Sequence, residues 1–180
     1  MKVGFFLGSF NPVHNGHIRI AEKVIKENGL DKVIFVPTMQ NPFKQQKPVD
    51  IETRAQLIKL SLLFSNCKIN DKPLLTYCKV DISEKELTPP FYSYKILKIL
   101  NEKYADDERF IICGQDTIEA IPQWKNGEDV LRENNFIVCE RTNESSTEVR
   151  QCVKENNIKR LSELVPSWLI KKIMYLYEHK

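Results

Sequence analysis

The chain has 180 residues, and 42% of them are hydrophobic, which is enough to bury the core of one ordinary domain. We therefore expect residues 1–180 to form a single domain. The net charge of +3 is spread along the chain, so the sequence lacks the basic tract typical of proteins that bind nucleic acid or a membrane surface. The five cysteines show no CxxC spacing, which argues against a disulfide framework and favours a reducing, cytoplasmic location. No stretch approaches the roughly 20 apolar residues that a membrane-spanning helix needs.

The first half of the chain predicts alternating strands and helices. Val3–Leu7 is a continuous apolar run, as expected of a parallel strand that is covered on both faces. A helix is predicted after it, with its apolar face at Ile18, Ala21, Val24 and Ile25. Gly29 is the expected C-terminal cap of that helix, and Lys32–Pro37 predicts a second buried strand. The polar, proline-containing stretch Thr38–Asp50 is longer than most connections, and we interpret it as a binding loop.

The second half continues the alternation. Apolar residues with helical spacing predict helices over 51–62, 94–104 and 169–177, and apolar runs predict strands over Arg109–Gly114 and Asn135–Glu140. Strands that alternate with helices indicate a doubly wound α/β fold, a Rossmann-like parallel sheet with helices on both faces. Ligands bind such sheets beyond the carboxyl ends of the strands, which is where the stretches "GSFNPVHNGH" and "GQD" fall.

The stretch "GSFNPVHNGH" links the first predicted strand to the first predicted helix. It matches neither of the glycine-rich phosphate motifs GxGxxG and GxxxxGK[ST], so its own chemistry has to carry the interpretation. Gly8 and Ser9 allow backbone N–H groups to approach a ligand. The helix that starts near Gly16 directs the positive end of its dipole at the same space. These features predict an anion-binding loop.

His14 and His17 lie three residues apart at the start of this helix. Their imidazoles can donate hydrogen bonds to phosphate oxygens. The plainest alternative is that they are ordinary turn residues. A metal site is a further alternative, but it needs a third ligand, and only His179 is left among the histidines.

A second motif, "ESSTEVR", ends at Arg150. Ser145 and Glu148 have the spacing of a capping box, which predicts a helix start whose N–H groups face a phosphate. Ser146 and Thr147 add hydroxyl donors, and Arg150 follows one turn later. A simple helix cap with a solvated arginine would produce the same string.

Together, "GSFNPVHNGH" and "ESSTEVR" resemble the HxGH and ISSTxxR signatures of the HxGH nucleotidyltransferase superfamily, in the same order. Within it, the chain is similar to nicotinate mononucleotide adenylyltransferases from about Lys2 to about Tyr177. The similarity includes "FVPTMQNPFK", "TRAQLIKLS", "FYSYKILKIL", "ICGQDTIEAIPQW" and "LVPSWLIKKIMYLY". Three residues depart from the usual pattern: Asn11 replaces an aspartate, Phe43 replaces a histidine, and Glu144 replaces an apolar residue. The second departure leaves Lys44 to act alone in its loop.

The resemblance implies that the chain joins the AMP part of ATP to a pyridine mononucleotide and releases pyrophosphate, in NAD biosynthesis. No protein nucleophile is needed, because the attacking phosphate oxygen is already an anion, so positioning and charge stabilisation carry the catalysis. The resemblance assigns the catalytic contacts to His14, His17, Lys44 and Arg150. It assigns ATP binding to Gly8, Ser9, Phe10, Gly16, Gly114, Asp116, Ser145, Ser146 and Thr147. It assigns the acceptor to Tyr92, Ser93 and Trp124, where Trp124 would form one wall of the pyridine pocket unless it is simply a packed residue.

We expect Mg²⁺ to enter with ATP and to be held mainly through the phosphates, with no metal site made of protein side chains. Phosphopantetheine adenylyltransferase and cytidylyltransferase activities are alternatives within the superfamily, and a non-catalytic nucleotide sensor is an alternative of another class. The resemblance favours nicotinate mononucleotide, although nicotinamide mononucleotide remains open. The oligomeric state is also open, a homo-oligomer included.

Overall fold

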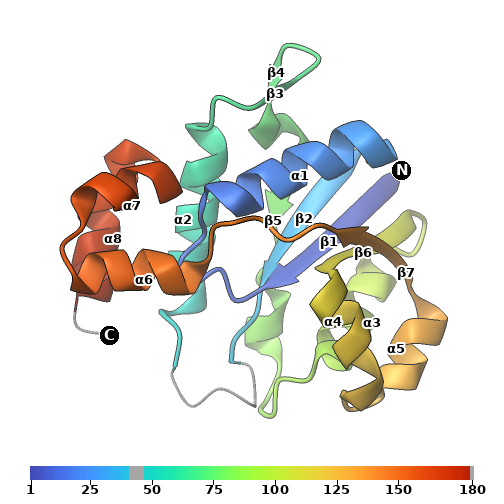
Figure 1. The fold of residues 1–180 in the computed structure, drawn as a ribbon. Helices are drawn as coiled ribbons and strands as arrows, with labels where there is room; N and C mark the ends of the chain where they lie inside the picture. The colour runs from blue at the N-terminus through green and yellow to red at the C-terminus, as the bar shows by residue number, and fades with distance from the viewer. Residues whose placement is uncertain (41–46, 179–180) are drawn as a thin grey trace.

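The computed structural model describes residues 1–40 and 47–178. In this part of the chain the main sheet has five strands, in the order β5-β2-β1-β6-β7, and every neighbouring pair is parallel (Figure 1). The strands are β1 (Lys2–Gly8), β2 (Lys32–Pro37), β5 (Cys78–Val80), β6 (Glu108–Gly114) and β7 (Asn135–Cys139). This arrangement confirms the predicted doubly wound, Rossmann-like fold.

Helices cover both faces of the sheet (Figure 1). Their bounds are α1 (Asn15–Asn28), α2 (Ile51–Leu63), α3 (Ser93–Lys103), α4 (Gln115–Ala120), α5 (Gly127–Glu133), α6 (Ser146–Lys154), α7 (Ile158–Leu164) and α8 (Ile170–Tyr177). The larger core cluster joins the sheet to α1, α2 and the C-terminal helices α6 to α8. Two smaller clusters join the other face to α3 and α5.

The strands supply both clusters because successive side chains of a strand point to opposite faces. Phe35 of β2 belongs to the larger cluster, whereas Ile34 and Val36 belong to a smaller one. All three are fully buried. This explains why the strand runs are continuously apolar and do not alternate with polar residues.

The predicted elements agree with the observed ones to within a few residues. The C-terminal cap of α1 is confirmed, because Gly29 has φ 65°, in the left-handed region that favours glycine. The sequence analysis did not predict β5, α4, α5 or α7, nor a small hairpin of β3 (Lys68–Ile69) and β4 (Lys72–Pro73). These elements have seven residues or fewer, too short for a clear apolar period.

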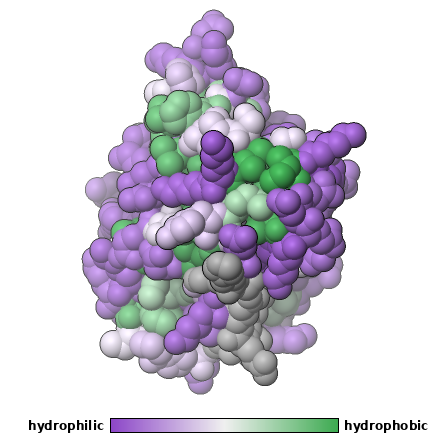
Figure 2. Space-filling model, turned by 90° about the vertical axis from the view of Figure 1, so that its left-hand side faces the viewer, coloured by the Kyte–Doolittle hydropathy of each residue, from purple (hydrophilic) through white to green (hydrophobic). Residues whose placement is uncertain are grey.

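The outer surface is largely hydrophilic on the side of the C-terminal helices, with separate apolar patches (Figure 2). Phe64 and Trp168 are both partly exposed, and their ring centroids lie 4.3 Å apart. Within residues 1–40 and 47–178, no helix combines the length and the apolar character that crossing a membrane requires.

The strand register places the ends of β1 and β6 side by side. Phe6 of β1 pairs with Ile112 of β6, and Gly8 of β1 pairs with Pro37 of β2. Because the strands are parallel, their carboxyl ends form one edge of the sheet. The loop that contains the histidines leaves from this edge.

Candidate active site

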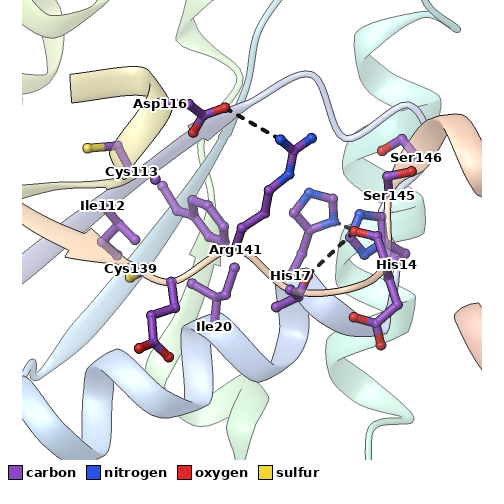
Figure 3. Close-up of a pocket in the computed structure, with 15 residues that line it drawn as sticks. His14, His17, Ile20, Ile112, Cys113, Asp116, Cys139, Arg141, Ser145 and Ser146 are labelled. Atoms are coloured by element: carbon purple, nitrogen blue, oxygen red, sulfur yellow. Dashed lines mark hydrogen bonds and ion pairs between the residues drawn. The ribbon is translucent and has the colours of Figure 1, made fainter. Parts of the chain in front are cut away.

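A cavity of about 260 Å³ lies at this edge, between the start of α1 and the connection from β7 to α6 (Figure 3). Its lining comes from segments that are far apart in the sequence. Among the described residues, those predicted as site residues that line it are His14, His17, Gly114, Asp116, Ser145 and Ser146. The fold therefore brings together the two motifs that the sequence places about 130 residues apart.

The two histidines lie against each other at the start of α1. His14 is the N-terminal cap of the helix, and the ring centroids of His14 and His17 are 3.7 Å apart. The backbone N–H of His14 donates to Nδ1 of His17 at 3.2 Å. Since Nδ1 of His17 accepts, the proton of its neutral ring is on Nε2. Nε2 of His17 is thus available as a donor.

Both imidazoles are neutral at physiological pH in this environment. Burial, with a smaller contribution from the guanidinium of Arg19, lowers the pKa of His14 to about 4. Burial also lowers the pKa of His17 well below its ordinary value, and His14 adds to this effect. Phosphate groups in the cavity would oppose these shifts, because a nearby negative charge favours the protonated ring.

Gly16 is buried between the histidines and the connection from β7 to α6. A Cβ at this position would lie 3.0 Å from Nδ1 of His14 and 3.0 Å from Oε2 of Glu144, and closer still to Oγ1 of Thr142. Glycine is therefore needed here because the three side chains approach the helix backbone. Its predicted role in ATP binding is not tested by this observation.

The start of α6 has one half of the predicted capping box. Oγ of Ser145 accepts from the backbone N–H of Glu148 at 3.1 Å. The Glu148 carboxylate instead accepts from Arg160 of α7, at 2.6 Å from Nη2. The Glu148 side chain thus links α6 to α7. Ser145 alone caps α6, and it also lines the cavity.

Ser146 and Arg150 contact the loop ahead of α1. Oγ of Ser146 donates to the carbonyl of Pro12 at 2.8 Å, and Nη1 of Arg150 donates to the carbonyl of Asn11 at 2.6 Å. A second nitrogen of Arg150 donates to Oγ1 of Thr147 at 3.2 Å. Arg150 and Thr147 do not belong to the described lining of the cavity. These side chains tie the loop ahead of α1 to α6.

Other predicted residues are not among the described residues that line this cavity. Phe10 is 1% exposed and its ring packs against Phe6 and Phe35, so only its backbone faces the loop surface. The carbonyl of Ser9 accepts from Nη1 of the buried Arg54 at 2.6 Å. Gly8 ends β1, and a Cβ at this position would lie 3.1 Å from the ring of Phe10. Lys44 lies outside the described residues.

Arg141 is a cavity residue that the sequence analysis did not single out. It follows β7 directly and extends across the cavity, where its guanidinium lies 4.0 Å from the carboxylate of Asp116 (Figure 3). Both side chains are largely exposed, so the pair is open to rearrangement. The predicted strand over Asn135–Glu140 already placed Arg141 at the carboxyl edge, and the rule for ligand sites in parallel sheets would have identified it.

A second cavity, of about 170 Å³, adjoins the first one. Ser93, at the start of α3, and Trp124, two of the residues predicted to bind the acceptor, both line it. Trp124 also packs against the apolar cluster around Ile121, so its two proposed roles are compatible. Tyr92 is not among the described lining residues, and its ring stacks on Tyr94 with centroids 6.1 Å apart.

The two cavities meet at the end of the central strands. Both are lined by Phe6, Ile112, Cys113 and Gly114. The first cavity carries side chains that can donate hydrogen bonds to phosphate. The second is mostly apolar and includes the indole ring of Trp124. Burial raises the pKa of Cys113 to about 11, so this thiol stays protonated and unreactive in the shared wall.

A parallel sheet with a histidine pair at a helix start and a serine-capped helix opposite is the arrangement expected of a nucleotidyltransferase. The chain belongs to the cytidylyltransferase-like family, whose model matches residues 5–173. Proteins similar to it include nicotinate-nucleotide adenylyltransferases. One, a probable enzyme of this kind from Hydrogenobaculum sp., is 30% identical over 97% of this chain and 96% of its own. The Bacillus subtilis enzyme is 33% identical over 78% of this chain and 69% of its own.

Solved structures share the fold. A putative nicotinate-nucleotide adenylyltransferase from Vibrio parahaemolyticus has a TM-score of 0.74 at 18% identity, covering 99% of this chain and 96% of that one. The nicotinic acid mononucleotide adenylyltransferase of Plasmodium falciparum, complexed with NaAD, has a TM-score of 0.74 at 17% identity, with 99% of each chain covered.

Proposed function

We propose that this chain transfers the adenylyl group of ATP to nicotinate mononucleotide and releases pyrophosphate, as a step of NAD biosynthesis. The observation that carries this proposal is the pair of adjoining cavities. A reaction between two nucleotides needs two sites whose reacting ends meet, and here the phosphate-type cavity and the apolar cavity share a wall. The relatives add the substrate class, since they are nicotinate-nucleotide adenylyltransferases.

In the proposed reaction, an oxygen of the acceptor's 5′-phosphate attacks the α-phosphorus of ATP. The new bond joins that oxygen to the α-phosphorus, the bond from the α-phosphorus to the bridging oxygen breaks, and its electrons leave with pyrophosphate. No proton has to be removed from the attacking group. Catalysis therefore depends on alignment and on donors at the phosphate oxygens where charge develops.

We assign the donors to the histidine pair. Nε2 of His17 carries a proton because Nδ1 accepts from the backbone of His14. The side chain is held between the rings of Phe10 and Phe6, at centroid distances of 4.8 and 5.9 Å. A donor that is fixed in this way costs little reorganisation at the transition state.

Arg150, Ser146, Thr147 and Lys44 are proposed to bind the departing pyrophosphate. Arg150 and Ser146 donate hydrogen bonds to backbone carbonyls of the loop ahead of α1. On binding pyrophosphate they would either keep these hydrogen bonds and add new ones, or replace them. The planar guanidinium suits two phosphate oxygens at once. We propose Asp116 as a partner of the ribose hydroxyls, because carboxylates accept such bonds in dinucleotide sites.

Mg²⁺ is proposed to arrive with ATP. The cavity contributes imidazole, hydroxyl and guanidinium groups, which suit phosphate oxygens, besides the carboxylates of Asp116, Glu140 and Glu144, and in the described part of the chain no three His, Cys, Asp or Glu side chains cluster as metal ligands. The ion, when bound, would neutralise charge on the phosphates and keep several waters. A single domain over residues 1–180, a cytoplasmic location and the oligomeric state stay predictions.

The test is pyrophosphate release with ATP and a panel of phosphorylated acceptors. The panel contains nicotinate mononucleotide, nicotinamide mononucleotide and phosphopantetheine, and a CTP arm contains phosphocholine. We expect turnover with the pyridine mononucleotides and a dinucleotide product by mass spectrometry. Turnover confined to phosphopantetheine or to CTP would replace the proposal by one of the alternatives, and ATP binding without turnover on any acceptor would favour a sensor.

A further inference from the structure

Glu144 is an acidic residue on the wall of the phosphate cavity. It stands in the connection from β7 to α6, where the related motif carries an apolar residue. Its side chain is only 13% exposed, and its carboxylate forms an ion pair with Arg19 of α1. A buried carboxylate beside a triphosphate site is unfavourable by itself, because like charges repel. Its presence there calls for a specific partner.

The carboxylate has a second neighbour besides Arg19. Oε2 of Glu144 and Nδ1 of His14 both lie 3.0 Å from the point where a side chain on Gly16 would begin. Both groups therefore border the space that the missing side chain of Gly16 leaves open. Nδ1 of His14 is fully buried and makes no full hydrogen bond among the described residues, although the backbone N–H of His17 approaches the ring in a capping-box arrangement. A buried ring nitrogen without a partner is rare and costly.

The charged and titratable groups around His14 decide which state the ring takes. They are His17 and Arg19 on α1, Asp116 on α4, and Glu140, Arg141 and Glu144 in the connection from β7 to α6. Without ligand, Arg19 engages the carboxylate and repels a proton on His14, so the ring is neutral with a pKa of about 4. A bound triphosphate adds negative charge beside the ring and reverses this preference.

We propose that Glu144 is a positioning residue for His14: when ATP occupies the cavity, its carboxylate accepts the Nδ1 proton of a protonated His14, whose Nε2 then faces the phosphates as a cationic donor. The proposal rests on the proposed function for the identity of the ligand. The proton comes from solvent as ATP binds. A cationic donor makes a stronger hydrogen bond to phosphate than a neutral one. Arg19 acts as the competitor, because it forms an ion pair with the same carboxylate.

The test is a pH titration of the His14 ring by NMR, with a non-hydrolysable ATP analogue and Mg²⁺. In the wild type, we expect the analogue to raise the His14 pKa and to bring a proton to Nδ1. In Glu144→Gln and Glu144→Ile, the pKa of His14 in the complex should be lower by at least about one pH unit. Glu144→Gln should keep the Nδ1 hydrogen bond, because the amide oxygen still accepts, and Glu144→Ile should lose it.

Two further variants serve as controls. Arg19→Met removes the competitor and should raise the His14 pKa in both the free protein and the complex. Glu148→Gln removes the same charge from the start of α6, where the carboxylate is turned toward Arg160, and should leave the titration unchanged. If Glu144→Gln left the His14 pKa in the complex unchanged, or Arg19→Met lowered it, the Glu144 side chain would be no more than a bridge to α1.

The pH dependence of kcat gives a second reading. We expect kcat of the wild type to fall at high pH as His14 loses its proton, and this limb to move to lower pH in both Glu144 variants, with an unchanged acceptor KM. A uniform loss of activity at all pH values would point to a structural role and would overturn the proposal. The NMR titration needs neither acceptor nor turnover, so its result does not depend on which acceptor the enzyme uses.

Discussion

The hydroxyl of Tyr177 donates a hydrogen bond of 2.8 Å to Oδ1 of Asn11. The same oxygen accepts from the backbone N–H of Val49 at 3.1 Å. One amide oxygen therefore joins the last helix, the segment ahead of α2 and the loop that precedes the histidines. The buried Arg54 reinforces this junction, because its Nε donates to the carbonyl of Val49 and its Nη1 to that of Ser9.

Tyr177→Phe removes only the hydroxyl and keeps the ring, which is 1% exposed. We expect a loss of about 1 kcal/mol in the free energy of unfolding, the usual value for one hydrogen bond. We also expect a several-fold rise in KM for ATP, because the loop is held less firmly. Urea denaturation and steady-state kinetics measure the two effects. An unchanged KM for ATP with the expected loss of stability would show that α8 supports the fold and not the site.

His17→Ala should remove most of the turnover and leave the fold nearly intact. The ring is a donor to developing charge, and loss of one such donor commonly costs about a hundredfold to a thousandfold in kcat. Circular dichroism and thermal unfolding check the fold, and pyrophosphate release gives kcat. Near wild-type turnover in this variant would exclude the phosphate role of His17.

Arg150→Lys keeps the charge and loses the planar fork. We expect a higher KM for ATP, with a nearly unchanged KM for the acceptor, because the residue is assigned to the triphosphate. The matched control is Arg160→Lys, since Arg160 binds Glu148 and Glu163 and has no contact with the loop ahead of α1 among the described residues. A change confined to the acceptor KM would move Arg150 to the other half of the site.

Glu84 links pH to stability through a buried carboxyl. It is 1% exposed and accepts a hydrogen bond from the backbone N–H of Met39. Burial raises its pKa to about 7, although this bond and Arg54 oppose the shift. The folded state therefore binds a proton that the unfolded chain releases near pH 4.5, so its contribution to stability is present below that pH and is lost as pH rises to about 7.

Glu84→Gln should abolish this loss. Between pH 4.5 and 7 the wild type should lose about 3 kcal/mol relative to the variant, from 1.36 kcal/mol per pKa unit. Urea denaturation across this range measures the difference between the two proteins, which cancels the opposite contribution of the histidines. The exposed Glu86, in the same turn, provides the control Glu86→Gln. If the free energy of unfolding of the wild type and of Glu84→Gln changed with pH in the same way, the raised pKa of Glu84 would be contradicted.

The sequence predicts the fold and the place of the site because both follow from simple patterns. Continuous apolar runs marked the covered strands, and the rule for parallel sheets placed the motifs at one edge. The direction of individual side chains could not be predicted in this way. Phe10 lies inside a polar-looking motif but packs into the core, and Arg54 interrupts an apolar period but is buried. Both depend on partners far away in the sequence, which a local pattern does not contain.

The hydrogen bonds of Arg150 illustrate the same limit. Its place in "ESSTEVR" predicts a phosphate ligand, whereas its guanidinium holds the carbonyl of Asn11, 139 residues away in the sequence. Glu144 was visible as a departure from the motif, but its approach to His14 required the geometry around Gly16. Sequence patterns identify which residues take part, and the structure shows which atoms they engage.

The wild type should favour nicotinate mononucleotide over nicotinamide mononucleotide by at least about tenfold in kcat/KM, or about 1.4 kcal/mol. A carboxylate can be held by backbone N–H groups, while an amide also needs a matching carbonyl. The segment Thr88–Tyr94 leads into α3, whose first residue, Ser93, lines the acceptor cavity. It can supply such N–H groups, although its two prolines supply none.

Trp124 provides the matched experiment on the acceptor. Its indole lines the cavity and would stack on the pyridine ring of either substrate, so it should set affinity more than choice. We expect Trp124→Phe to weaken both acceptors slightly and Trp124→Ala to weaken both strongly, with the ratio of their kcat/KM values preserved. Thermal unfolding accounts for the packing that Trp124 also provides against Ile121. Parallel kinetics with the two mononucleotides decide the question, and equal efficiencies would overturn the acid preference while leaving adenylyl transfer itself in place.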